Sequence, residues 1–296
     1  MKPIDLIICA KDSGRSDWRC GLGPRRILEQ FLSSISAIPR DKPRMVEIEA
    51  HVDYETDSSL VFEAQRQIAQ YAARSRSAGR FPLILGGNCN TAVGGIGGVG
   101  AAGCGLIWFD AHGDFNTPEN TATGFLDGMG LAMAVGRCWR HVLSTVPGFS
   151  PILEELTAIV GARDLDPWEG EELAASTIDR ISVEDIRKAG IAAGFGAFIS
   201  RLKNKVDRVY LHIDIDVLDP VDAPANHYNA PGGLSIAELL GAIAFIGERI
   251  RIAGAGIGSY DPACDADGRT AMAAAQVIEA LVAAAWGTEA MRPSKG

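Results

Sequence analysis

Short apolar segments alternate with longer helical patterns along the whole chain, and this alternation constrains the fold more than any other feature. The apolar runs are residues 6–10, 83–87, 105–110, 158–162, 209–216 and 253–258. A strand that is apolar on both faces belongs in a parallel sheet covered by helices on each side. We therefore predict a three-layer α/β/α architecture with a central, mostly parallel sheet.

Three segments between and after these runs are predicted helices. Residues 59–79 have an amphipathic spacing that ends at Gly79, and residues 270–286 form an alanine-rich pattern. In the segment 234–250, Ser235 is followed three residues later by Glu238, a spacing typical of a capping box. The polar motifs follow apolar runs, and ligand sites in such sheets lie beyond the carboxyl ends of the strands. We expect these motifs to form one site.

Composition limits the domain organisation and the partners. The 296 residues show no break in composition, which favours a single domain over residues 1–296. With 37 acidic and 28 basic residues and no basic block, nucleic acid and anionic membranes are unlikely partners. The chain has no stretch of 18 consecutive apolar residues, so no membrane span is predicted. The apolar run near the N-terminus is predicted to be a strand rather than a signal peptide. Six cysteines without CxxC spacing favour a cytoplasmic location with free thiols.

The motif DAHGD, which ends an apolar run, places one histidine between two aspartates. If the segment is extended, Asp110, His112 and Asp114 share one face, as the ligands of a divalent metal would. The alternative is a strand end at which the aspartates cap a helix while the histidine packs. A second acidic motif would favour the metal site.

Such a motif is LHIDID, where Asp214 and Asp216 again end an apolar run. Two carboxylates buried side by side require a cation. Arg163 belongs to another turn, and Lys205 and Arg208 precede the strand at its opposite end. A metal ion is therefore the better explanation.

The segment LILGGNCN places Cys89 just after a glycine turn. This segment lacks the lysine of a phosphate-binding loop. A lone cysteine is often a buried apolar residue, but Cys89 shares its position at a strand end with the acidic motifs. Four aspartates, one histidine and one thiolate suit two divalent ions, and oxygen-rich ligation favours manganese over zinc. Paired ions roughly 3.5 to 4 Å apart can activate a water molecule.

Together these motifs resemble the ureohydrolase family, which contains arginase, agmatinase and formiminoglutamase. The similar segments are GGNCN, DAHGDFNTPENTATG, GARDLD and DIDVLDP, in that order along the chain. The resemblance implies an arginase/deacetylase-type fold and a centre of two Mn²⁺ ions whose bridging hydroxide attacks the central carbon of a guanidino or related group. Family members are often oligomers, so a homo-oligomer is compatible with the sequence.

Carried over by motif, the resemblance assigns the metal ligands. One ion would bind Cys89, Asp114 and Asp214, and the other would bind His112, Asp110 and Asp216, with Asp110 and Asp214 bridging both. The positions at which arginases hold the amino-acid end of the substrate are Asn116, Thr123 and Asp166. Their retention favours an α-amino acid over a bare amine.

Four positions depart from the usual family pattern. Cys89 replaces a histidine ligand, with Asn88 before it, and Asp127 lies where arginases carry a histidine that moves protons. Asp127 is either a solvated loop acid or a replacement acid/base. Ser259 replaces a glutamate that anchors the guanidinium group, and Tyr228 replaces a small residue and would narrow the pocket.

The cysteine, DFNTPE and TGFLDGM are most similar to the hydroxyarginine-hydrolysing members of the family, from D-cycloserine biosynthesis, which release hydroxyurea and ornithine. The leading hypothesis is a metal-dependent amidinohydrolase that cleaves a C–N bond of a small guanidino amino acid, either arginine or N-hydroxyarginine. An alternative is hydrolysis of a formimino or other amidine group, because Ser259 removes the expected anchor. A further alternative is a metal-poor, non-catalytic family member.

Overall fold

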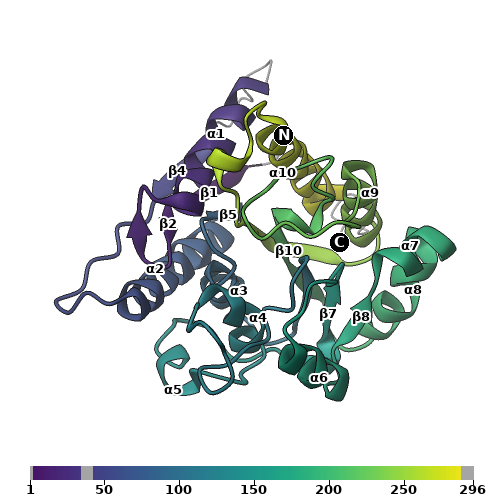
Figure 1. Cartoon of the computed structure of the whole chain (residues 1–296), viewed down its shortest axis with the longest axis horizontal. Coiled ribbons are helices and arrows are strands. Elements are labelled where there is room, and N and C mark those ends of the chain that lie inside the picture. The colour runs from purple at the N-terminus through teal and green to yellow at the C-terminus, as the bar shows by residue number, and fades with distance from the viewer. Residues whose placement is uncertain (1–2, 35–42, 288–296) are drawn as a thin grey trace, which may run out of the picture.

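The computed structural model describes residues 3–34 and 43–287 and is built around one large parallel sheet (Figure 1). Its strand order is β4-β1-β5-β10-β9-β6-β7-β8, and every neighbouring pair is parallel. The strands are β1 (Ile4–Cys9), β4 (Arg44–Glu47), β5 (Phe81–Gly86), β6 (Cys104–Phe109), β7 (Thr157–Val160), β8 (Asp179–Ile181), β9 (Arg208–Asp214) and β10 (Arg251–Gly258). A separate hairpin joins β2 (Lys11–Asp12) and β3 (Arg15–Ser16).

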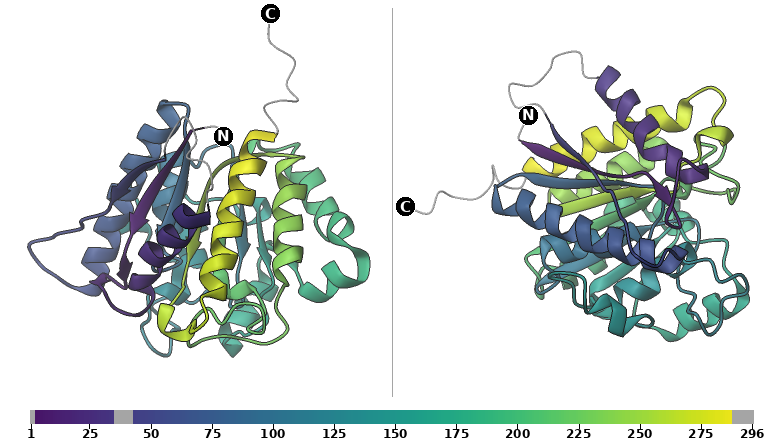
Figure 2. Two further views of the ribbon diagram at one scale, coloured as in Figure 1. Left: turned by 90° about the horizontal axis from the view of Figure 1, so that it is seen from above. Right: turned by 90° about the vertical axis from the view of Figure 1, so that its left-hand side faces the viewer.

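Helices cover both faces of the sheet, as the views in Figure 2 show. One face packs on α1 (Gly23–Ser34), α8 (Ile191–Leu202), α9 (Ile236–Gly247) and α10 (Arg269–Gly287). The other face packs on α2 (Asp57–Ser77), α3 (Thr91–Val99), α4 (Gly130–Ala134), α5 (Arg140–Leu143) and α6 (Pro167–Ala175). The helix α7 (Val183–Ala189) precedes α8. The predicted three-layer architecture is therefore confirmed.

Alternation along the strands divides the core between the two faces. In β1, Leu6 belongs to the core beneath α1 and α10, whereas its neighbour Ile7 belongs to the core beneath α2 and α3. Both side chains are fully buried. This is the pattern expected of a parallel strand that is covered on both faces.

The predicted helices are present with small differences in their bounds. The capping box at Ser235 and Glu238 forms as expected at the start of α9. The helix α2 begins two residues earlier than predicted, because Thr56 caps it through the backbone of Ser59. By length and composition α10 could cross a membrane, but 61% of its apolar window is buried inside the fold, as in a core helix.

Two strands of the large sheet, β4 and β8, do not correspond to any of the predicted apolar runs. The edge strand β4 is mostly exposed and β8 has three residues, so neither forms a long apolar run. The glycine-rich segment TAVGGIGGV, for which no element was predicted, forms the fully buried helix α3. Its glycines allow close contact with α2, since a Cβ on Gly94 would lie 2.7 Å from the main-chain oxygen of Gln65.

The topology collects the polar motifs at one edge of the sheet. The strands β5, β10, β9 and β6 are neighbours, and Gly258 of β10 pairs with Asp214 of β9. Phe109 of β6 pairs with Ile213 of β9. The segments that follow these strands therefore leave the sheet side by side, at the edge where ligands bind in this class of fold.

Candidate metal centre

Asp110 lies at the start of the loop after β6 and is completely buried. Its Oδ2 accepts a hydrogen bond from the indole of Trp108 at 2.9 Å, and its Oδ1 accepts one from the main-chain nitrogen of His112 at 2.7 Å. These two donors fix the orientation of the carboxylate. The same loop therefore presents His112 beside Asp110, and the His112 Nδ1 lies 3.4 Å from the Asp110 Oδ1.

The second acidic motif supplies the other side of this pair. The main chain of β9 ends at Asp214, and Asp216 lies in the 3-10 helix η4 (Ile215–Val217). The Asp216 Oδ2 lies 3.4 Å from the His112 Nδ1 and accepts a hydrogen bond from Asn226 at 3.0 Å. The imidazole nitrogen of His112 thus lies between two carboxylates, one from the segment after β6 and one from the segment after β9.

The backbone around Asp114 differs from the extended form assumed for DAHGD. The strand ends at Phe109, and Asp114 has a φ of 49°, in the left-handed region. The prediction that Asp110, His112 and Asp114 share one face of a strand is therefore wrong. The turn instead directs Asp114 toward Cys89 and Asp127, on the other side of the site.

Cys89 follows β5 and is buried, as expected for a free thiol, and it contacts both the apolar core and acidic side chains. Its Sγ lies 2.9 Å from the Asp214 Oδ2, 3.9 Å from the Asp110 Oδ2 and 3.2 Å from the Ser259 Oγ. Burial, followed by the charge of Asp214, raises the pKa of this thiol well above its usual value.

Three overlapping groups of side chains bring their ligand atoms within 4.8 Å of one another. They share Asp110 and Cys89, so they form one continuous centre. The groups are Cys89, Asp110 and Asp214; Asp110, His112 and Asp216; and Cys89, Asp114 and Asp127. All six residues with the predicted ligand types therefore meet at this edge of the sheet, and Asp127 joins them.

The donor set fits metal ions better than it fits ion pairs within the chain. Within residues 3–34 and 43–287, no arginine or lysine pairs with Asp110, Asp114, Asp214 or Asp216, and the Asp114 Oδ2 is buried without a partner. Arg163 contacts main-chain oxygens instead, including that of Ala230 at 2.8 Å. Burial raises the pKa of Asp114 and of Asp214 well above the usual range, which divalent cations would reverse.

Asp127 is buried and hydrogen-bonded, so the solvated loop acid considered from the sequence is ruled out. It lies in the 3-10 helix η2 (Asp127–Met129). Its carboxylate accepts hydrogen bonds from the main-chain nitrogen of Cys89 at 2.6 Å and from the Asn88 side chain at 2.8 Å. Burial, with the neighbouring charge of Asp12, raises the pKa of Asp127 to about 7.

The predicted substrate-binding residues line one cavity of about 800 Å³ above this centre. Asn116 donates a hydrogen bond to Asp166 at 3.0 Å, and Asp166 also begins α6 with a capping box. Thr123, in the loop that also carries Asn116, is exposed. Tyr228 also lines the cavity and is half exposed, and its ring lies 6.1 Å from that of Phe125.

Ser259 is buried directly beside the metal-ligand groups, in the segment after β10. Its φ is 63°, a conformation that few non-glycine residues adopt, and its main-chain oxygen accepts a hydrogen bond from Asn226 at 2.9 Å. Strained backbone of this kind persists where its surroundings fix it, often at functional sites.

Several supporting residues were not predicted from the sequence. Trp108 and Asn226 orient Asp110 and Asp216, and Asn88 joins Asp127 to Asp12 through its side-chain amide. Single polar residues of this kind carry no motif. Glu169 accepts a hydrogen bond from the main-chain nitrogen of Phe115 at 2.7 Å, and its spacing from Asp166 could have indicated a capping box.

The comparisons with known proteins identify the family. The arginase-family model matches residues 5–283. The chain belongs to the arginase family. The arginase of Bacillus caldovelox is 30% identical over 301 residues, covering 95% of this chain and 98% of that protein. The prediction that this arginase-family protein is a metal-dependent amidine hydrolase is thereby confirmed at the level of the family.

Solved structures agree with this assignment. The arginase of Bacillus cereus superposes with a TM-score of 0.84 at 30% identity, covering 95% of this chain and 98% of that one. The formimidoylglutamase of Bacillus subtilis superposes with a TM-score of 0.78 at 23% identity, covering 99% and 88%. The second comparison shows that the arginase-type fold is shared, and it carries no information about the substrate.

Proposed function

We propose that this arginase-family protein is a dinuclear-manganese amidinohydrolase that cleaves a C–N bond of a guanidino amino acid. The overlap of the buried ligand groups at Cys89 and Asp110 carries the proposal. Cys89, Asp114 and Asp214 would hold one ion, and Asp110, His112 and Asp216 would hold the other, with Asp110 and Asp214 shared. When bound, two such ions lower the pKa of a water molecule and supply a nucleophile at neutral pH.

Asp127 is the proposed acid/base. A general acid or base is most effective when its pKa lies near the working pH. The pKa of Asp127 is raised to about 7, and its carboxylate is held by Asn88 and Cys89. Asp127 would therefore hold a proton beside the reacting group and deliver it to the departing nitrogen, the role that a histidine has in arginases.

The amino-acid end of the substrate is proposed to bind at Asn116, Thr123 and Asp166. These residues line the same cavity as the ligand groups and combine amide, hydroxyl and carboxylate groups. A carboxylate suits an α-ammonium group, and amide and hydroxyl donors suit an α-carboxylate. A guanidino compound that lacks the α-carboxylate or the α-ammonium group would lose the corresponding contacts.

We propose N-hydroxyarginine as the preferred substrate, on the basis of Ser259 and the sequence similarity described above. A serine in place of a glutamate leaves more space and a neutral hydroxyl beside Cys89. That hydroxyl can exchange hydrogen bonds with an N-hydroxyl group, whereas it lacks the charge to anchor an unmodified guanidinium. The same replacement favours a formimino substrate as the second candidate.

A substrate panel tests the proposal. Manganese-loaded protein would be assayed with N-hydroxyarginine, arginine, agmatine, which lacks the α-carboxylate, and formiminoglutamate. We expect the highest kcat/KM with N-hydroxyarginine, and a value roughly 100-fold lower with agmatine, because agmatine has no α-carboxylate to accept hydrogen bonds at Asn116 and Thr123. In Asn116→Ala protein this preference over agmatine should shrink.

Other outcomes have distinct meanings. Preferred hydrolysis of formiminoglutamate would replace our proposal with the formimino alternative. Equal turnover of agmatine and arginine would refute the proposed binding of the amino-acid end. Absence of turnover with every compound, despite bound metal, would favour the non-catalytic alternative.

A further inference from the structure

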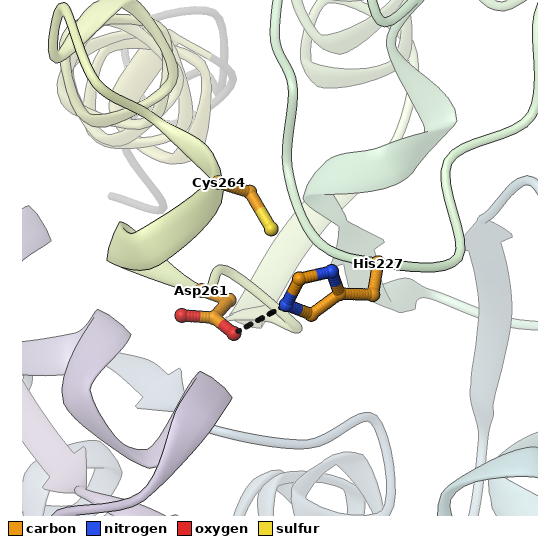
Figure 3. A group of neighbouring side chains, drawn as sticks. All are labelled: His227, Asp261 and Cys264. Carbon is orange, nitrogen blue, oxygen red and sulfur yellow. Dashed lines mark ion pairs between the residues drawn. The ribbon is translucent and has the colours of Figure 1, made fainter.

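A second group of potential metal ligands shares no residue with the proposed manganese centre, and two of its members, His227 and Asp261, line the same cavity. It consists of His227, Asp261 and Cys264, which we name the rim triad; Figure 3 shows their side chains converging from two segments of the chain. The His227 Nε2 lies 3.7 Å from the Asp261 Oδ2, and one ligand atom of each residue lies within 4.8 Å of those of the other two.

Asp261 is the buried member of the rim triad. It is only 2% exposed, and its Oδ1 accepts a hydrogen bond from the main-chain nitrogen of Ala263 at 2.9 Å. Its Oδ2 faces the imidazole of His227, whose side chain is 63% exposed. No arginine or lysine in the described part of the chain forms an ion pair with this carboxylate. A buried carboxylate in this position favours a bound cation.

We propose that the rim triad binds a zinc ion. Imidazole nitrogen, thiolate sulfur and carboxylate oxygen are the ligands that zinc takes in proteins, and three protein ligands leave a fourth position for water. Cys264 is the only one of the six cysteines that is not buried, so an ion from solvent can reach it. Binding converts the Cys264 thiol to a thiolate and releases its proton to solvent.

The ligand types distinguish this site from the manganese centre. Four of the six proposed manganese ligands are aspartates, whereas the rim triad has one carboxylate, one imidazole and one thiolate. Softer nitrogen and sulfur ligands select zinc, and carboxylates suit manganese. One chain would therefore hold two kinds of metal at sites of different chemistry.

The residues of the rim triad come from two segments of the chain, one after β9 and one after β10. His227 lies between Asn226 and Tyr228, in the segment after β9, and Cys264 ends the 3-10 helix η5 (Pro262–Cys264), after β10. Asp261 already joins these segments, because its main-chain nitrogen donates to the Ala225 oxygen at 2.8 Å. Zinc would add a second connection and hold the segment that carries Tyr228.

The reactivity of Cys264 tests this proposal without an activity assay. Manganese-loaded protein, kept in excess manganese, would be treated with a thiol-alkylating reagent with and without micromolar zinc, and mass spectrometry would locate the label. We expect zinc to slow the labelling of Cys264 by roughly tenfold or more. In His227→Gln protein this protection should be lost, and in the matched control His141→Gln, an exposed histidine of α5, it should remain.

Metal counts provide the second measurement. We expect about one zinc per chain in the wild type with the manganese content unchanged, and no zinc in Cys264→Ser protein. Equal labelling rates with and without zinc would overturn the proposal. So would zinc that replaces manganese one for one in both the wild type and Cys264→Ser. If the proposed manganese centre is wrong, the measured manganese content will be low whether or not the rim triad binds zinc.

Discussion

Asp127 is the residue whose position most changes the interpretation of the sequence. It lies where a loop acid would ordinarily be solvated, but its carboxylate is buried against the main chain of Cys89 and the side chain of Asn88. Burial, with the neighbouring charge of Asp12, raises its pKa to about 7. A group of this kind can accept and return a proton in one catalytic cycle.

Replacing Asp127 with asparagine tests this role. Asp127→Asn keeps the shape of the side chain but cannot transfer a proton, so we expect kcat to fall by roughly 100-fold with the manganese content unchanged. Steady-state kinetics and elemental analysis on the same preparation would measure both. The control is Asp164→Asn, an exposed acid that also lines the cavity.

Two outcomes would contradict the assignment of Asp127. Unchanged kcat in Asp127→Asn protein would show that no proton passes through this carboxylate. Loss of manganese would instead make Asp127 a ligand, as its place in the group with Cys89 and Asp114 allows.

The sequence predicts the residues that carry motifs and misses those that support them. The positions of Asp110, His112 and Asp214 follow from their places after apolar runs, because parallel strands end at the same edge. Asn226 is recognisable only from the fold, since its contact with Asp216 joins a long loop to the end of a strand. The left-handed turn at Asp114 was missed because an aspartate carries no strong signal for it.

At the scale of elements, the glycines of the helix α3 allow it to pack closely against α2. A helix of the sequence TAVGGIGGV has poor intrinsic propensity, yet it is completely buried between α2 and the sheet. A Cβ on Gly94 would lie 2.7 Å from the Gln65 oxygen and 2.7 Å from the Ile68 Cβ. Close packing therefore outweighs the propensity, which explains why local sequence reasoning did not predict this helix.

Two matched substitutions test this balance. Gly94→Ala should lower the free energy of unfolding by about 1–3 kcal/mol, because the added methyl group forces α2 and α3 apart. Gly196→Ala in α8, where a Cβ meets no atom within 4 Å, should raise the free energy of unfolding by up to about 1 kcal/mol through helix propensity. Urea titrations would measure both, and a stabilising Gly94→Ala would refute the packing argument.

Asp5, at the opposite edge of the sheet, connects β1 to β4, to α2 and to the residue before β5. Its carboxylate in β1 accepts hydrogen bonds from Arg44 of β4 at 2.8 and 2.9 Å, from Ser75 of α2 at 2.6 Å, and from Arg80, which precedes β5. Burial alone would raise the pKa of Asp5, but these donors more than offset it and hold the pKa below its usual value.

The lowered pKa of Asp5 predicts a loss of stability in acid. A depressed pKa means that the carboxylate contributes fully above the unfolded-state pKa of about 3.9, and that this contribution disappears as the pH falls through the lower folded-state value. The difference in unfolding free energy between the wild type and Asp5→Asn should therefore be large at pH 6 and shrink toward pH 3. A difference independent of pH would contradict this, and Glu248→Gln, at an exposed ion pair, should show little effect.

At the scale of the whole molecule, the fold explains how buried carboxylates from distant parts of the sequence come together. The neighbouring strands β5, β10, β9 and β6 release their loops at one edge, and the loops bring Cys89, Asp110, Asp214 and Ser259 into contact. The alternation of strands and helices predicted this architecture. It could not predict the strands β4 and β8, because short exposed strands lack an apolar pattern.

The central claim is a two-manganese centre with a thiolate ligand. The most direct measurement is the manganese content of the purified protein by elemental analysis, after incubation with manganese, for the wild type and for Cys89→Ser. We expect close to two manganese ions per chain in the wild type and about one in the variant. A wild-type protein that binds no manganese, or a variant that still binds two ions, would contradict the account.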